Sequence, residues 1–302
     1  MDPVIKVRNL RKVYRLGKEK VVALENVNLE VPPGQICCIL GTSGSGKSTF
    51  LNQLAGLEKP TKGAVFINGV NISKLNERQL AKFRQKNLGF IFQSYNLLPA
   101  LTALENVAMP LMFRGLSRRK RNKRAKELLD LVGLKGRLKH KPTQMSGGQQ
   151  QRVGIARAFV AKPSIVFADE PTGNLDTKTT VEVMQLMVRL AHEHNQTLVL
   201  VTHDSELAEF ADRIVTLIDG NIVSDRINEH KRTDYVPYEK ELQEAGAQSP
   251  DEAPPAGGTI EEPAQEPAGD ESPPPGGEAG TEEAPKTAEQ QERTQERVEQ
   301  AI

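Results

Sequence analysis

The chain has 302 residues, of which 37% are hydrophobic, and 40 basic against 39 acidic residues give it a formal charge of +1. A chain of this length can bury a sizeable core, which excludes a disulfide-stapled miniprotein and a wholly disordered polypeptide. A charge near zero argues against a dedicated nucleic-acid-binding protein, so we expect no nucleic-acid partner.

The charge is unevenly distributed along the chain. Residues 239–302 hold 17 acidic and 4 basic residues, so residues 1–238 carry a formal +14. The same C-terminal stretch contains nine of the 19 prolines and no aromatic residue. It cannot bury enough apolar area to offset its ordering entropy, which predicts a folded domain over 1–238 and a disordered acidic tail over 239–302. The tail is interpreted either as a solubilising segment or as a docking segment for a basic partner.

Apolar runs bounded by turn residues predict strands in the first quarter of the chain. They cover residues 4–10, 23–31, 34–40, 63–67 and 70–72. Cys37 and Cys38 are neighbours on the third strand, so their side chains point to opposite faces and cannot easily form a disulfide. We expect two reduced core cysteines in a cytosolic protein. No window approaches the roughly 20 apolar residues of a membrane span, and the start lacks a signal-peptide pattern, so the chain itself is expected to be soluble.

The rest of the chain alternates helices with strands. Turn and helix signals dominate from about residue 96 to 161, where Ala125, Leu128, Leu129 and Val132 recur at helical spacing. Short apolar strands are predicted over 164–170 and 197–204, a helix over 205–212, and a final hairpin over 213–224. Strands alternating with helices predict an α/β fold around a parallel sheet.

The strongest local pattern is the glycine-rich stretch GTSGSGKS between an apolar strand and a helical run. It matches G-x-x-x-x-G-K-[ST], in which backbone N–H groups and the helix N-terminus bind phosphate oxygens. Lys47 is expected to reach the β- and γ-phosphates, and Ser48 to ligate Mg²⁺. The nucleotide-binding set predicted here is Gly41, Thr42, Ser43, Gly44, Ser45, Gly46, Lys47, Ser48 and Thr49.

Two carboxylates follow the apolar strand IVFA, at the edge where parallel sheets bind ligands. Asp169 is expected to hold Mg²⁺ through water. Glu170 is expected to act as general base on the attacking water, a role that typically contributes about 10²- to 10⁴-fold to the rate.

A second anion-binding helix start is predicted at Ser146-Gly147-Gly148-Gln149, where Ser146 is a good N-cap and two glycines expose backbone N–H groups. One chain rarely needs two phosphate sites for one nucleotide. The economical interpretation is that this segment contacts the nucleotide held by a second copy of the chain.

In type, order and spacing, these motifs resemble the nucleotide-binding subunit of an ATP-binding-cassette (ABC) transporter over about residues 2–230. The resemblance implies a P-loop NTPase (RecA-like) core, an antiparallel β subdomain and an α-helical signature subdomain over about 96–160. It also implies ATP and Mg²⁺ as ligands, a homodimer with two sandwiched nucleotides, and a separate transmembrane permease. The subunit would then lie at the cytoplasmic face of the plasma membrane.

The resemblance assigns roles to four further residues. Tyr14 would stack on adenine, Gln93 would link Mg²⁺ and attacking water to the permease, His203 would sense the γ-phosphate, and Asp176 would lie at the dimer seam. Residue by residue, Tyr14 could instead be a surface aromatic, Gln93 a structural amide and His203 a helix-start residue. Met145 replaces the leucine usual before Ser146, a conservative apolar change.

Basic residues concentrate between residues 114 and 126, where eight lysines and arginines occur. They are interpreted either as a solvated helix face or as a surface attracted to anionic lipid headgroups.

Three classes of ABC ATPase compete. They are a transport ATPase, a soluble protein that acts on ribosomes, and a chromosome-maintenance or repair ATPase. The ribosome-acting class resembles two cassettes in one chain, whereas this chain has one glycine-rich loop. The repair class has a long coiled coil between the glycine-rich loop and the SGGQ segment, and the interval from Gly41 to Ser146 is too short for one. The transport class remains. The stretches FIFQSYNLLPALTALENV and ADEPTGNLD look most like macrolide exporters and lipoprotein-release systems, with an amino-acid-type importer as the alternative.

Overall fold

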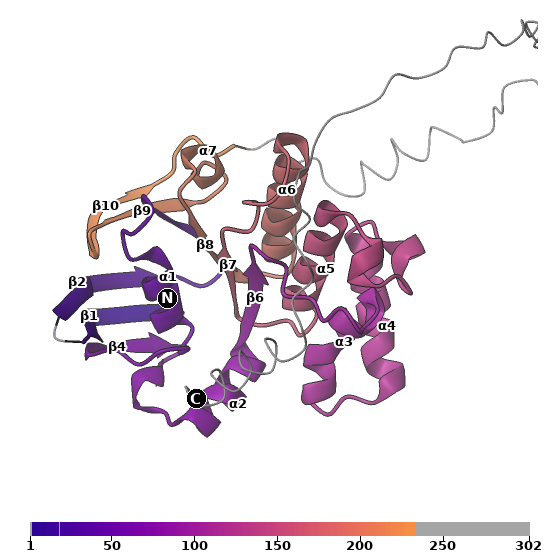
Figure 1. Ribbon diagram of the computed structural model, residues 1–302, viewed down its shortest axis with the longest axis horizontal. Helices are drawn as coiled ribbons and strands as arrows, with labels where there is room; N and C mark the ends of the chain where they lie inside the picture. Colours follow the sequence, from indigo (N-terminus) through magenta and orange to yellow (C-terminus); the bar gives the residue numbers. More distant parts are fainter. Residues whose placement is uncertain (1, 18, 233–302) are drawn as a thin grey trace, which may run out of the picture. The chain divides into compact units, whose positions relative to one another are not determined.

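The computed structural model describes residues 2–17 and 19–232 (Figure 1). All of them lie in the first of the two units into which the chain divides, residues 1–248 and 249–302. The tail predicted over 239–302 therefore lies outside the described residues. Within the described ranges, no helix is both long enough and apolar enough to cross a bilayer.

A six-stranded sheet with the order β10-β9-β3-β8-β7-β6 forms the centre of this unit. All neighbouring strands of this sheet are parallel except β10, which is antiparallel to β9. The strands are β3 (Ile36–Leu40), β6 (Leu88–Phe92), β7 (Ile165–Asp169), β8 (Thr197–Thr202), β9 (Arg213–Ile218) and β10 (Asn221–Ile227). Strand β6 was not predicted from the sequence.

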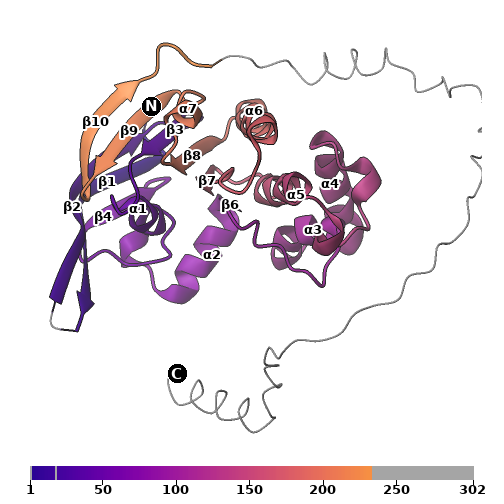
Figure 2. The same ribbon diagram turned by 45° about the horizontal axis from the view of Figure 1, so that its top comes forward.

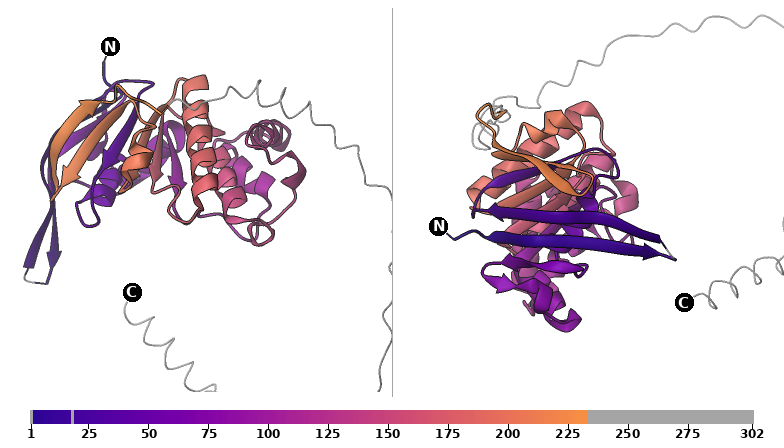
Figure 3. Two further views of the ribbon diagram at one scale, coloured as in Figure 1. Left: turned by 90° about the horizontal axis from the view of Figure 1, so that it is seen from above. Right: turned by 90° about the vertical axis from the view of Figure 1, so that its left-hand side faces the viewer.

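A second, antiparallel sheet with the order β2-β1-β4-β5 contains β1 (Ile5–Leu16), β2 (Glu19–Val31), β4 (Lys62–Ile67) and β5 (Val70–Asn71). The β1-β2 hairpin is visible in both views of Figure 3. Both of its strands are longer than the predicted 4–10 and 23–31. The added residues pair across the hairpin, for example Val13 with Val22, but they are largely polar or exposed and so give no hydrophobic alternation.

Seven α-helices occur in the described residues, and they pack on the sheets or on one another (Figure 2). Residues 103–159 hold three of them, in the stretch where turn and helix signals dominate the sequence, while the helix predicted over 205–212 already ends at Ala208. The helices are α1 (Lys47–Leu54), α2 (Glu77–Asn87), α3 (Ala103–Phe113), α4 (Arg118–Leu131), α5 (Gly147–Phe159), α6 (Thr177–Glu193) and α7 (Ser205–Ala208), with 3₁₀ turns at Ile72–Lys74, Lys135–Arg137 and Pro142–Gln144.

The parallel sheet separates two hydrophobic cores. Cys37 belongs to the core shared with α1 and the antiparallel sheet, and Cys38 belongs to the core shared with α3 to α6. Both thiols are free and fully buried, and burial raises the pKa of each. The predicted alternation of the two side chains is confirmed.

The register of the parallel strands places four loops at one edge of the sheet. Leu40 pairs with Thr202, and Asp169 pairs with both Val201 and Phe92. Because parallel strands end at a common edge, the segments that begin with Gly41, Gln93, Glu170 and His203 emerge side by side.

Candidate nucleotide site

The glycine-rich loop connects β3 to α1, and the backbone at its end adopts a conformation that favours glycine. Gly44 and Gly46 have φ values of 81° and 100°. A Cβ on Gly46 would lie 2.5 Å from the carbonyl oxygen of Ala23, so the close approach of β2 also requires glycine. Gly46 is the N-cap of α1 without a side-chain capping bond, which leaves the first backbone N–H groups of the helix available to an anion.

Lys47 is the central cation of this loop. Its side chain is buried, and Nζ donates a hydrogen bond of 2.8 Å to the carbonyl oxygen of Thr42. The loop thus folds back over its own lysine. A buried ammonium next to free N–H groups favours a polyanionic ligand such as a chain of phosphates.

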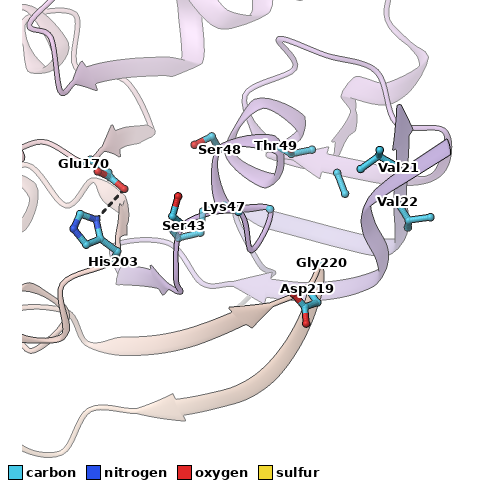
Figure 4. A pocket seen from close by; sticks show the side chains of 13 residues that line it. Val21, Val22, Ser43, Lys47, Ser48, Thr49, Glu170, His203, Asp219 and Gly220 are labelled. Atoms are coloured by element: carbon cyan, nitrogen blue, oxygen red, sulfur yellow. Dashed lines mark hydrogen bonds and ion pairs between the residues drawn. The ribbon is translucent and has the colours of Figure 1, made fainter. Parts of the chain in front are cut away.

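A cavity of about 550 Å³ lies over the loop (Figure 4). Glu170 and His203 stand at one end of it, Val21 and Val22 at the other, and Lys47 and Ser48 lie between. Its lining is Val21, Val22, Ala23, Ser43, Gly44, Gly46, Lys47, Ser48, Thr49, Glu170, His203, Asp219 and Gly220. The cavity therefore has an acidic end, a cationic middle and an apolar end.

Glu170 follows β7 and is held in an unusual backbone conformation. Its φ is 42°, in the left-handed region that is unfavourable for a residue with a side chain. Its N–H donates to the carbonyl oxygen of Val201 at 2.9 Å, and the buried Gln151 amide of α5 donates to the carbonyl oxygen of the next residue, Pro171. His203 Nδ1 lies 3.1 Å from Glu170 Oε1, so the predicted base and the predicted sensor are in direct contact.

Asp169 ends β7 beside Glu170. Burial raises the pKa of its carboxyl, the Glu170 charge raises it further, and Lys47 opposes both effects. Its Oδ1 is buried and has no hydrogen-bond partner within the described residues. A buried, unpartnered carboxylate oxygen is a donor that suits Mg²⁺, so this residue fits that ion.

Gln93 follows β6 at the same sheet edge but does not line the cavity. Its backbone oxygen accepts a 3.1 Å hydrogen bond from Asn174 Nδ2. Its amide lies against Gly173, where an added Cβ would be 2.6 Å from Nε2. The loop after β6 and the loop after β7 thus support each other.

Tyr14 lies near the apolar end of the cavity, on β1 opposite Val21. Its hydroxyl donates to Glu58 Oε2 at 2.7 Å, and Lys12 Nζ lies 4.9 Å from the ring centroid. Glu58 also accepts from Lys12 at 3.0 Å. Burial, reinforced by Glu58, raises the pKa of the phenol. Tyr14 does not line the cavity, and its stacking role stays a prediction.

The second predicted helix start lies away from this cavity. Ser146 caps α5 in a capping box with Gln149, with 3.3 Å hydrogen bonds in both directions. Asp176 caps α6 by accepting from the Thr179 N–H at 3.0 Å, and this bond lowers the pKa of its carboxyl. None of Ser146, Gly147, Gly148, Gln149 and Asp176 is part of the cavity lining.

Sequence reasoning missed part of the cavity wall. Val21, Val22 and Ala23 were not assigned to the site, and Asp219-Gly220 was interpreted only as a hairpin turn. Close packing places them there, since a Cβ on Gly220 would lie 2.7 Å from the carbonyl oxygen of Ala23. The sequence pattern marks a turn at Asp219-Gly220, but it does not show that this turn packs against Ala23.

Comparisons with known proteins point to one family. A sequence model described as "ABC transporter" matches residues 24–173. An ABC transporter ATP-binding protein of Thermotoga maritima is 52% identical over 74% of this chain and 94% of its own length. The lipoprotein-releasing system ATP-binding protein LolD 2 of Caulobacter vibrioides is 46% identical over 75% of this chain and 99% of its own.

Two further matches extend the comparison. The macrolide export ATP-binding/permease protein MacB of Vibrio parahaemolyticus is 47% identical over 75% of this chain and 35% of its own length. A dimeric structure of the ATP-binding cassette MJ0796 of Methanocaldococcus jannaschii, bound to ADP and Pi, superposes with a TM-score of 0.70 at 45% identity, covering 74% of this chain and 99% of that one. The predicted fold class and the predicted subfamily resemblance are both confirmed. With the glycine-rich loop, the paired acids and the histidine assembled at one sheet edge, the chain belongs to the ABC transporter family, as one of its ATP-binding and ATP-hydrolysing subunits.

Proposed function

We propose that two copies of this chain bind two ATP molecules between them, head to tail, and that hydrolysis drives a separate membrane permease. The observation that supports the dimer is that the two predicted phosphate-binding segments of one chain do not share a cavity. The N-terminus of α1 opens into the cavity, whereas Ser146 to Gln149 lie outside it. The cassette MJ0796, whose solved structure is dimeric and holds ADP and Pi, supports the same arrangement.

Each copy contributes its cavity to one nucleotide. Phosphates lie along the loop from Gly41 to Thr49 with Lys47 against the β- and γ-oxygens, and the base lies at the apolar end near Val21. We expect Tyr14, which pairs with Val21 across the hairpin, to stack on that base. Ser146 to Gln149 of the second copy close the site from the other side, with Asp176 at the seam. The capping box holds the Ser146 hydroxyl at the start of α5, where it can donate to phosphate.

Ser48, Gln93 and Asp169 would hold Mg²⁺, which when bound neutralises phosphate charge and polarises the transferred group. Glu170 accepts the proton of the attacking water. His203, 3.1 Å from Glu170 Oε1, orients that carboxylate and senses the γ-phosphate from the same edge. The left-handed backbone at Glu170 fixes the carboxylate before substrate arrives, which lowers the reorganisation needed for catalysis.

The partner we propose is a permease of the macrolide-export or lipoprotein-release type. MacB and LolD proteins, each about 46 to 47% identical to this chain, support this choice, and no relative named here favours the amino-acid-type importer. The transported substrate is then selected by the permease, because the residues assigned to this cavity serve the nucleotide.

We place the chain at the cytoplasmic face of the plasma membrane, with the basic face of α4 toward anionic headgroups. Arg119, Lys120, Arg124 and Lys126 are exposed and form no ion pair with any described residue. The nearby Phe113 is 63% exposed at the end of α3. Cations beside an exposed aromatic side chain are typical of a surface that binds bilayers. Replacing these four residues by glutamine is expected to abolish sedimentation with anionic vesicles, and unchanged sedimentation would contradict the contact.

Mixing two inactive variants tests the composite site. Lys47→Ala disables the cavity of its own chain, whereas Ser146→Arg disables the site of the partner chain. In a mixed dimer one of the two sites is intact on both sides, so the mixture should recover about a quarter of the wild-type ATPase activity by random pairing. A mixture as inactive as either variant would contradict the head-to-tail arrangement.

Affinity purification from detergent-solubilised membranes tests the transport role. A tagged chain should retain a membrane protein with few predicted spans and a large extracytoplasmic domain. A six-span permease together with a substrate-binding protein would favour the importer instead.

A further inference from the structure

Arg157, in the last turn of α5, holds the loop that carries Gln93. Its guanidinium donates hydrogen bonds to the carbonyl oxygens of Tyr95, at 2.8 Å, and of Asn96. Burial lowers the pKa of Arg157, which nevertheless remains charged because an arginine titrates far above neutral pH. A half-buried cation that bonds two consecutive backbone carbonyls is placed to fix the conformation of that backbone.

The backbone that Arg157 holds is one that needs support. Tyr95 and Asn96 have φ values of 60° and 46°, so two consecutive non-glycine residues occupy the left-handed region. This conformation is unfavourable for residues with a Cβ and persists only where surrounding contacts enforce it. Two residues earlier, Gln93 is held from the other side by Asn174.

The same loop also touches the opposite end of α5. A Cβ built on Gly147 would lie 2.8 Å from the Tyr95 hydroxyl oxygen, so the tyrosine ring reaches the first turn of the helix. Gly147 belongs to the segment that serves the partner's nucleotide. Helix α5 therefore contacts this one loop both through its last turn, at Arg157, and through its first turn, at Gly147.

We infer that Arg157 is a positioning residue which, together with Tyr95, couples the loop of Gln93 to the first turn of α5 in the same subunit. The inference rests on the proposed function, in which Gln93 serves the nucleotide of its own chain and Ser146 to Gln149 serve that of the partner. A shift of Gln93 on nucleotide binding is then transmitted along α5 to the other composite site. The two ATP sites of the dimer communicate through the interior of each subunit.

Arg157→Lys tests the coupling, with Arg152→Lys as the matched control one and a half turns earlier on α5. Arg152 donates to Glu182 Oε2 at 2.7 Å and does not contact the loop. Hydrogen exchange of residues 93–97 in the nucleotide-free protein should accelerate at least about tenfold in Arg157→Lys, because a lysine lacks the two forked nitrogens with which Arg157 reaches the two carbonyls, and should not change in Arg152→Lys. Unchanged exchange in Arg157→Lys would overturn the inference.

The Mg²⁺ dependence of ATP hydrolysis gives a second readout. Gln93→Ala should raise the Mg²⁺ concentration for half-maximal activity, and Arg157→Lys should raise it by about the same factor. The double variant should resemble Gln93→Ala alone, because residues acting through one contact are not additive. Additive effects would overturn the inference, whereas no effect of Gln93→Ala would contradict the proposed role of Gln93 itself.

A suppressor pair covers the case in which Arg157→Lys does not fold. Gly147→Ala pushes a methyl group toward the Tyr95 hydroxyl and should accelerate exchange of residues 93–97. Tyr95→Phe removes that hydroxyl, so the double variant Gly147→Ala/Tyr95→Phe should return the exchange toward the wild-type rate. If Tyr95→Phe leaves the Gly147→Ala exchange unchanged, the proposed contact between the loop and the first turn of α5 is wrong.

Discussion

The two helix N-termini predicted to bind phosphate, those of α1 and α5, differ in how many other site residues surround them. The N-terminus of α1 opens into the cavity, which also holds a buried Lys47, a strained Glu170 and a contacting His203. The N-terminus of α5 is capped by its own Ser146 and Gln149 and adds nothing to that cavity. In the dimer we propose, one half of the site is organised before ligand binds, and the other becomes a site only when a second copy approaches.

In the half of the site formed by the cavity, replacing Glu170 should slow ATP hydrolysis without preventing ATP binding. Glu170→Gln keeps the shape and the hydrogen-bonding reach of the side chain but cannot accept a proton, so hydrolysis should fall by at least about 10²-fold. ATP binding should persist, and the dimer should accumulate in size-exclusion chromatography with ATP. Hydrolysis near the wild-type rate would remove Glu170 from the role of base.

In the same half of the site, replacing Lys47 should weaken the binding of ATP. Lys47→Ala removes the one buried cation of the loop, and losing a charge-assisted hydrogen bond should weaken ATP binding by about 10- to 100-fold. Isothermal titration of the isolated subunit measures this directly. Intact affinity would contradict the assigned phosphate contact.

A change in the half of the site formed by Ser146 to Gln149 should weaken dimerisation rather than ATP binding by the monomer. Ser146→Ala should leave ATP affinity of the monomer unchanged but weaken ATP-driven dimerisation about tenfold, because the lost contact belongs to the partner's nucleotide. Thr102→Ala is the matched control, since Thr102 forms the equivalent capping box with Glu105 at the start of α3. Both changes should cost about 1 kcal/mol of folding stability, and only Ser146→Ala should affect dimerisation in analytical ultracentrifugation.

The smallest expected effect is a gain in stability. Asp169 is less stable as a buried carboxylate than in water, so its pKa in the folded state lies above its unfolded value. The folded state then binds more protons, and stability falls as pH rises through that window. Asp169→Asn should therefore raise the unfolding free energy by roughly 1 kcal/mol at pH 7 in the absence of Mg²⁺, and the gain should vanish near pH 4. A lower melting temperature at pH 7 would contradict this reading of the site.

Local patterns predicted much of the fold and of the cavity half. The glycine-rich loop, the acids after β7 and the cap of α5 depend on contiguous residues, and the alternation of Cys37 and Cys38 follows from strand geometry alone. Strand β6 and the full length of the β1-β2 hairpin were missed. The added hairpin residues are largely polar or exposed and give no hydrophobic alternation, whereas β6 is short and pairs with β7, which lies far along the chain.

The sequence by itself determined which residues we assign to the chemistry, since phosphate loops and helix caps are built from consecutive residues. Only the tertiary structure decided which of them share a cavity. It brought Val21 and Asp219-Gly220 to the wall of the site, and it left Ser146 outside. It also joined Arg157 to the backbone of Tyr95 and Asn96, 62 and 61 residues away. Such contacts depend on how strands and helices pack, which short-range spacing does not encode.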